Sequence, residues 1–207
     1  MVVVTPARKR RQEQTRSDLL GAAGSVFARR GYHNASVEEI AAEAGYTTGA
    51  VYSNFKGKEE LFLALADRQV DDRVAEIRAV AETAEEGGAP GVAAAEQFRA
   101  FLERDPEWPL LFYEFWSMGA RNKKLQGELR KRRDAVRDAL AETLERIASQ
   151  AGFELRFAAQ DLATAIAASI NGLAFERAAD PDGLPDEVFE EFIIAVLGCA
   201  IAIPEPS

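Results

Sequence analysis

Apolar residues recur at helical spacing along almost the whole chain. Between Thr15 and Arg30 they fall at i, i+1, i+4, i+7 and i+8, at Leu19, Leu20, Ala23, Val26 and Phe27, which places them on one face of a helix. No stretch alternates apolar and polar residues between turn signals in the way that strands do. The pattern predicts an all-α protein with helices over residues 15–30, 36–45, 47–55, 58–86, 91–104, 107–120, 122–151, 157–179 and 185–201.

Turn and capping residues divide these helices. Gly31 follows the first helix as a left-handed cap. Ser36 opens the second, with Glu39 three residues later as a capping box. We expect two domains. Residues 1–57 would form a small N-terminal domain of three short helices, and residues 58–207 a larger helical domain that begins with a long connecting helix.

The segment from Ser36 to Phe55 has the anatomy of a helix-turn-helix: a capped helix, a tight turn at Gly45, and a second short helix. Val51 and Phe55, four residues apart, would face inward. The outward face of the second helix would then carry small, hydroxylated and aromatic residues that suit entry into a DNA groove: Thr48, Gly49, Tyr52 and Ser53. The alternative is three short helices that only pack together, with Tyr52 a surface aromatic.

Charge is distributed unevenly along the chain. The net charge is −9, but residues 1–58 hold nine Lys or Arg and five Asp or Glu, so this segment is +4 and the remainder is −13. The opposite signs suggest that the N-terminal segment faces a polyanion, whereas the rest of the chain is acidic. Ser36 and Lys58, each at the start of a helix, suit phosphate contacts. The basic run from Arg8 to Arg11 is interpreted as a disordered tail, with a minor-groove arm as the alternative.

The residues from Thr15 to Leu61 resemble the DNA-binding domain of the TetR family over about 47 residues. The most specific part is Gly-x-Val-Tyr-x-x-Phe-x-x-Lys-Glu-Glu-Leu, from Gly49 to Leu61. The resemblance implies a dimeric transcriptional regulator. It also implies phosphate contacts from Ser36, Tyr52 and Lys58, and base or backbone contacts from Thr47, Thr48 and Gly49.

Two positions of the same segment depart from that family. Ser53 and Asn54 stand where the family often has an aromatic residue and a histidine. Both are kept among the candidate DNA-contacting residues. The family's base preference does not transfer to this chain, because these two side chains differ.

Aromatic residues are concentrated between positions 98 and 118, far above the 9% of the whole chain. An aromatic face with few polar groups suits a concave apolar ligand site, and a solid core is the alternative. We expect a cavity framed by the fourth to eighth helices that holds an apolar or aromatic effector. Its candidate residues are Phe98, Leu102, Trp108, Phe112, Phe115, Trp116, Asn171 and Phe175.

The last two helices differ from the others in composition. Residues 158–179 are rich in Ala, Ser and Gly, and the chain from 192 onward has little polar face. A terminal helix that is apolar nearly all round needs cover from more than its own subunit. We expect a four-helix dimer interface with a symmetry mate. The candidate residues are Leu162, Ile166, Leu173, Phe189, Phe192, Ile193, Val196 and Leu197.

Catalysis and cofactor binding find no support in the composition. His33 is the only histidine and Cys199 the only cysteine, so neither a nucleophile–base pair nor a metal cluster is visible. No apolar run approaches the ~20 residues that span a bilayer. The sequence predicts a cytoplasmic regulator without cofactor or membrane partner. It would bind double-stranded operator DNA as a homodimer and leave a palindromic operator when a small molecule enters its C-terminal domain. The preference for repression over activation comes from the family resemblance alone. The alternative function is a helical adaptor that binds only protein.

Overall fold

The computed structural model describes residues 6–183 and 185–199, and these form helices without a strand among them. The predicted all-α fold is confirmed for this part of the chain, and helix ends agree with the expected ones to within a few residues except in α1. The helices are α1 (Pro6–Asn34), α2 (Val37–Glu43), α3 (Thr48–Asn54), α4 (Lys58–Glu85), α5 (Pro90–Arg104), α6 (Trp108–Gly119), α7 (Lys123–Ala151), α8 (Ala159–Ala179) and α9 (Asp186–Cys199).

Helix α1 begins at Pro6, about nine residues earlier than the apolar stripe indicates. The interpretation of Arg8 to Arg11 as a disordered tail is therefore wrong: these residues are helical. Arg, Lys and Gln are strong helix formers, so the helix continues where no core face is present. At its other end, Gly31 adopts φ 72° and ψ 167° and interrupts the helix, in a region that only glycine occupies readily.

The chain forms two compact units, Met1–Gln69 and Val70–Ser207. The expected boundary lay between residues 57 and 58, at the start of α4. The structural division lies inside α4, because the first turns of this helix pack against α1. Helix α4 therefore belongs to both units.

The first unit is organised around a small aromatic core. Phe27 of α1 and Phe62 of α4 are almost completely buried, with ring centroids 5.8 Å apart. Tyr32 packs edge-on against Phe62 at 5.5 Å. These three rings join α1 to α4. The first turns of α4 are therefore fixed within the first unit, which is called the head below.

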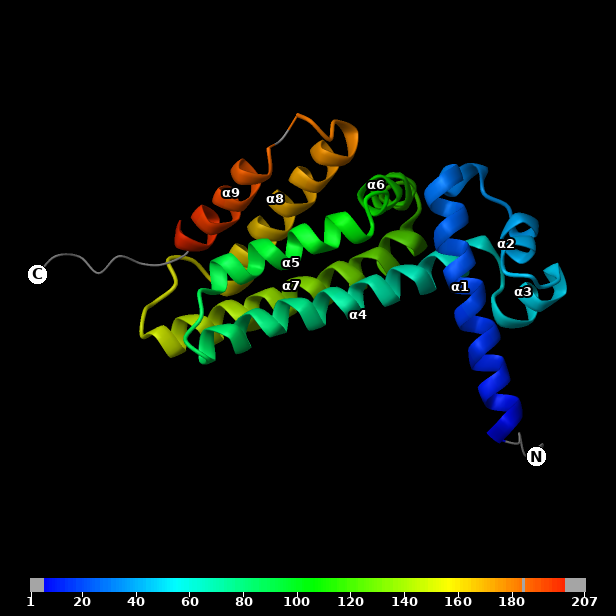
Figure 1. The fold of residues 1–207 in the computed structure, drawn as a ribbon, viewed down its shortest axis with the longest axis horizontal. Helices are drawn as coiled ribbons and strands as arrows, with labels where there is room; N and C mark the ends of the chain where they lie inside the picture. Colours follow the sequence, from blue (N-terminus) through cyan, green and yellow to red (C-terminus); the bar gives the residue numbers. More distant parts are fainter. Residues whose placement is uncertain (1–5, 184, 200–207) are drawn as a thin grey trace, which may run out of the picture. The chain divides into compact units, whose positions relative to one another are not determined.

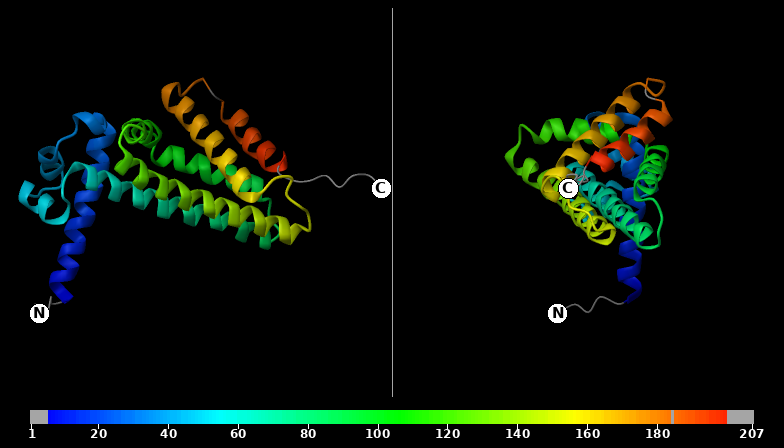
Figure 2. Two further views of the ribbon diagram at one scale, coloured as in Figure 1. Left: turned by 180° about the vertical axis from the view of Figure 1, so that it is seen from behind. Right: turned by 90° about the vertical axis from the view of Figure 1, so that its left-hand side faces the viewer.

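In the second unit, α4, α5 and α7 run side by side, and α8 and α9 lie together on one side of them (Figures 1 and 2). Thr143 of α7 donates a hydrogen bond to the carbonyl of Ile77 in α4, at 3.3 Å. Helices α7 and α8 meet through small side chains, Ala141, Ala159 and Ala163, which allow close approach. Among the described helices, none is long and apolar enough to cross a membrane.

Candidate DNA interface and ligand cavity

Both helices of the predicted helix-turn-helix begin with a side-chain cap. The Ser36 hydroxyl accepts from the backbone N–H of Glu39 at 3.1 Å, and the Glu39 carboxylate accepts from the N–H of Ser36 at 3.1 Å. This is the expected capping box. Thr47 caps α3 by accepting from the N–H of Ala50 at 3.2 Å. The caps fix where each helix starts, and Gly45, with φ 72°, makes the turn between them.

The two faces of α3 differ as the periodicity indicates. Val51 and Phe55 are almost completely buried, whereas 55% of Tyr52 is exposed. Thr47, Gly49 and Ser53 are exposed too, and Thr48 and Asn54 are half-buried. The Ser53 hydroxyl and the Asn54 amide both donate to the carbonyl of Ala50, at 2.8 Å each. The exposed side of α3 is therefore polar, uncharged and centred on one tyrosine.

Helix α1 holds α3 through two polar contacts that the sequence did not reveal. The Arg16 guanidinium donates to the carbonyl of Asn54 at 2.9 Å and lies 4.1 Å from the centre of the Phe55 ring. The Tyr46 hydroxyl donates to Asp18 at 2.9 Å. The Arg16 contact lies at the C-terminal end of α3, and the Tyr46 contact lies in the turn before its start. Helix α1 therefore fixes the direction of α3 at both ends.

The ammonium of Lys58 is used inside the protein. It donates to the carbonyls of His33 and Ala35, at 3.0 and 2.9 Å, and lies 4.7 Å from the centre of the Tyr32 ring. A phosphate contact from Lys58 would require the ammonium to share or leave these carbonyls. Its position instead ties the start of α4 to the turn between α1 and α2.

Two further cations of the first unit are held by carboxylates. Arg29 forms a two-pronged ion pair with Glu43, at 3.2 and 2.9 Å, and Arg30 pairs with Glu39 at 3.3 Å. The hydrogen bond from Arg29, together with its charge, holds the pKa of Glu43 below its ordinary value. These pairs join α1 to α2. The cations that remain most accessible to a polyanion are in the first turns of α1, where Arg8, Lys9, Arg10 and Arg11 are exposed.

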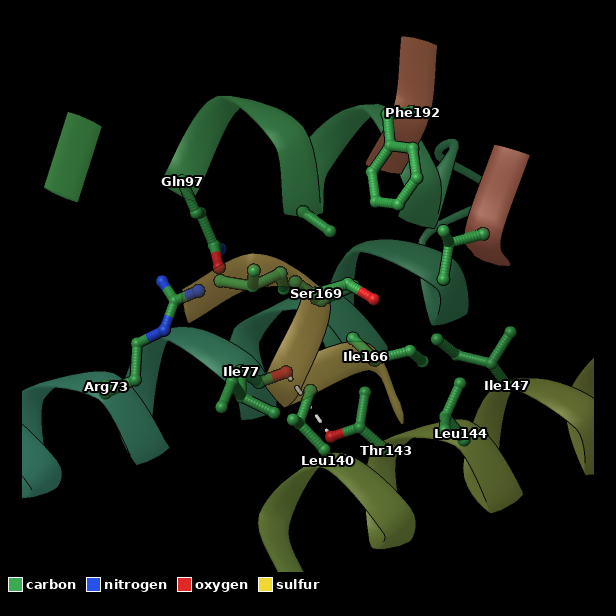
Figure 3. A pocket seen from close by; sticks show the side chains of 14 residues that line it. Arg73, Ile77, Gln97, Leu140, Thr143, Leu144, Ile147, Ile166, Ser169 and Phe192 are labelled. Atoms are coloured by element: carbon green, nitrogen blue, oxygen red, sulfur yellow. Dashed lines mark hydrogen bonds between the residues drawn. The ribbon is translucent and has the colours of Figure 1, made fainter. Parts of the chain in front are cut away.

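The second unit encloses an apolar cavity of about 60 Å³ among α4, α5, α7, α8 and α9 (Figure 3). Four of the described lining residues are polar: Arg73, Gln97, Thr143 and Ser169. The others are Ile77, Val80, Ala94, Leu140, Leu144, Ile147, Ile166, Ile170, Phe192 and Val196. No cluster of His, Cys, Asp or Glu among the residues described could hold a metal ion.

The cavity shares no described lining residue with the predicted effector set. Phe115 is completely buried, Phe112 stacks against Trp116 at 5.7 Å, and Tyr113 packs on Phe175 at 4.7 Å. Trp108 packs against the buried Phe101. These aromatic side chains fill space around α6 rather than line the cavity. Asn171 is exposed, and the side chains of Phe98 and Leu102 lie outside the described residues.

Three residues predicted for the dimer interface line the cavity: Ile166, Phe192 and Val196. Only 4% of Ile166 is exposed, so its side chain packs within its own subunit. Phe192 remains 37% exposed. Leu162 and Leu173 are half-buried. The side chains of Phe189, Ile193 and Leu197 lie outside the described residues.

Two family models match the chain. Residues 19–65 match "Bacterial regulatory proteins, tetR family", and residues 91–198 match "BetI-type transcriptional repressor, C-terminal". The second match alone covers more than half of the 207 residues. The HTH-type transcriptional activator FasR of Mycolicibacterium smegmatis is 38% identical over 103 residues, which span 50% of this chain and 47% of FasR.

Solved structures share the whole architecture. A transcriptional regulator from Rhodococcus sp. Rha1 superposes with a TM-score of 0.70 at 27% identity, over 89% of this chain and 95% of that one. FadR from Bacillus subtilis, solved in complex with stearoyl-CoA, superposes with a TM-score of 0.72 at 16% identity, over 90% and 99%. At that identity the likeness to FadR shows the fold alone.

The position of Lys58 generates a prediction about stability. Lys58→Met removes two hydrogen bonds to backbone carbonyls, one exposed and one partly buried, which should lower the free energy of unfolding by about 0.5–1.5 kcal/mol. Lys56→Met is the matched control, because the exposed side chain of Lys56 should be replaceable within about 0.5 kcal/mol. Urea unfolding followed by circular dichroism measures both. Equal stability of the two variants would contradict the structural role.

Proposed function

Because the chain belongs to the TetR family, whose members are transcriptional regulators and not enzymes, we propose that it is a repressor that a small molecule releases from a palindromic operator. The observation that carries the proposal is the two-sided α3: Val51 and Phe55 anchor it while Tyr52 and its polar neighbours are exposed. A short helix presented in this way suits the major groove. Residues 1–57 would bind DNA and residues 58–207 would bind the effector and the second subunit.

The proposed DNA contacts come from α2, α3 and the turn between them. Tyr52 would contact a phosphate through its hydroxyl, and Ser36 would do so at the start of α2. Thr48 and Gly49 would approach base edges or backbone, since their positions on α3 admit close contact. Thr47, Ser53 and Asn54 would adjust hydrogen bonds that they already make within α3. Lys58 would act mainly by fixing the head.

The basic first turns of α1 would add phosphate contacts beyond the recognition sequence. Residues 6–15 continue the helix past Arg16 by roughly 15 Å at 1.5 Å per residue. Figure 1 shows this part of α1 projecting away from α2 and α3. Four consecutive cations on a helix point in all directions around its axis, so DNA alongside it would meet positive charge in any rotation.

The effector would bind in the cavity of the second unit. Three of its lining residues, Arg73, Ile77 and Val80, lie on α4, the helix whose first turns belong to the head. A ligand that favours a different position of α4 would therefore favour a different position of α3, and in a dimer it would change the spacing of two recognition helices.

The partner subunit would pack on the exposed apolar positions of the last two helices. Val188 is 50% exposed and Phe192 is 37% exposed, and they lie one turn apart on α9. A dimer built on α8 and α9 would place two heads for successive major grooves, about 34–36 Å apart. As a regulator that reads DNA, the protein would act in the cytoplasm.

Selection of duplexes from a random pool tests the DNA-binding function. The purified protein should enrich a palindrome, and Tyr52→Ala should lower affinity for that duplex by at least about tenfold, since the variant has neither the phosphate-binding hydroxyl nor the ring that packs in the groove. Because Tyr52 is mostly exposed, the melting temperature should stay unchanged. No enrichment at low or physiological salt would favour a helical adaptor that binds only protein.

The basic turns of α1 should steepen the salt dependence of binding. Replacing Arg8, Lys9, Arg10 and Arg11 by Gln should weaken binding to the selected duplex. It should also reduce the slope of log K against log salt by about 0.9 for each DNA phosphate that these side chains neutralise in the wild type. The control replaces four exposed cations of α7 by Gln: Lys123, Lys124, Arg130 and Lys131. If both variants show the same slope, the first turns of α1 bind no phosphate.

Burying a charge at the proposed interface should dissociate the dimer. Val188→Glu should shift the mass measured by light scattering from dimer toward monomer at micromolar concentration, because an unpaired carboxylate is costly to bury. Leu110→Glu, at an exposed apolar position of α6, should leave the mass unchanged. A monomeric wild type, or a fully dimeric Val188→Glu, would rule out this interface.

A further inference from the structure

The cavity in the second unit has its one described charged lining residue, Arg73, at one end, and the Ser169 hydroxyl lies nearer the middle (Figure 3). Figure 3 shows the Gln97 amide pointing toward the Arg73 guanidinium at one end, with Leu144 and Ile147 toward the opposite end. The Thr143 hydroxyl donates to a backbone carbonyl, so its proton is already used. A ligand in this cavity would therefore meet a charged partner only at the Arg73 end.

Arg73 is the only charged residue among the described lining residues. Only 18% of its side chain is exposed, and it pairs with Glu76 at 3.2 Å. Glu76 also accepts from Arg104 at 3.1 Å, and Arg104 pairs with Asp105 at 2.9 Å. Two guanidiniums and two carboxylates thus form one network beside the cavity, and no carboxylate from the described residues lines the cavity itself.

Burial of the Arg73 guanidinium carries a desolvation cost. Desolvation lowers the pKa of Arg73 below its ordinary value, although Glu76 acts in the opposite direction. An arginine stays protonated in proteins, so the desolvation cost remains in the folded protein as a charge in a low-dielectric site. A neutral ligand would displace water and leave that cost in place. An amine would add repulsion, and an anion would reduce the cost.

The cavity size limits the ligand in this state of the protein. The volume of about 60 Å³ is well below the ~150 Å³ of an apolar cavity that holds benzene. A short aliphatic acid would therefore bind only if the cavity widened. Phe192 lines the cavity and is 37% exposed, so its side chain is the one best placed to move.

Resting on the proposed effector role of this cavity, we propose that the effector is a small monocarboxylate with an apolar body. Its carboxylate would accept from Arg73, with Gln97 as a second donor, and its apolar part would lie toward Leu144 and Ile147. The guanidinium geometry matches a carboxylate with two parallel hydrogen bonds. Sequence-specific DNA binding does not depend on this assignment.

Three probes with the same apolar body test the ligand class: hexanoate, hexan-1-ol and hexylamine, titrated by calorimetry against the full-length protein. The wild type should bind hexanoate at least about tenfold more tightly than the other two, since a hydrogen bond to a charged partner favours the acid by that factor or more. Arg73→Gln should abolish this preference and keep the affinity for hexan-1-ol. Arg73→Lys should keep part of it.

Arg78→Gln is the matched control, because Arg78 lies on the same helix, is 56% exposed and pairs with Glu142 outside the cavity. It should keep the preference for hexanoate, and melting temperatures verify that each variant is folded. Equal binding of hexanoate and hexan-1-ol, or a preference that survives in Arg73→Gln, would overturn the carboxylate while leaving the cavity as a ligand site. If none of the three probes binds the wild type, both the ligand class and the effector role of this cavity fail.

Discussion

A helix of seven residues cannot hold its own shape in water, and α3 has seven. Everything that this helix does therefore depends on contacts with its neighbours. Val51 and Phe55 bury its inner side, Thr47 caps its start, and Arg16 donates to the carbonyl of Asn54 at its end. The exposed face is positioned because the other three sides are occupied. The same reasoning extends to Lys58, which joins the start of α4 to the turn that precedes α2.

Four of the nine cations of residues 1–58 make contacts between elements of the head. Arg16 meets the end of α3, Arg29 and Arg30 pair with carboxylates of α2, and Lys58 binds two carbonyls. The net charge of +4 over residues 1–58 therefore overstates what a DNA backbone would meet on the globular part of the head. The accessible cations are concentrated in the first turns of α1, so the affinity and the specificity of DNA binding would reside in different elements. Tyr52 and its neighbours would read the groove, and the first turns of α1 would supply attraction that does not depend on sequence.

Local periodicity was enough to predict the helices and both faces of α3, because a residue's direction on a short helix follows from its position in the turn. The cavity could not be predicted in this way. Aromatic density around Phe115 indicates burial but not whether atoms fill the space. Phe115 is completely buried, and the cavity described above is lined by other residues. Arg73 stands next to Asp71 and Asp72 and resembles a surface charge. Its spacing from Ile77 and Val80, four and seven residues, was the available signal that it shares their apolar face.

The apolar residues of α8 and α9 were also hard to assign. A sequence does not show whether such a residue packs inside its own subunit or against a partner subunit. Ile166 belongs to the cavity and Val188 is exposed, although both are aliphatic residues on apolar helices. Phe192 does both, because it lines the cavity and remains partly exposed. A ligand that moved Phe192 would therefore disturb the proposed dimer face directly, as well as α4 through Arg73. If both routes operate, linkage requires that operator DNA and dimerisation each change the affinity for the ligand by the same factor that the ligand imposes on them.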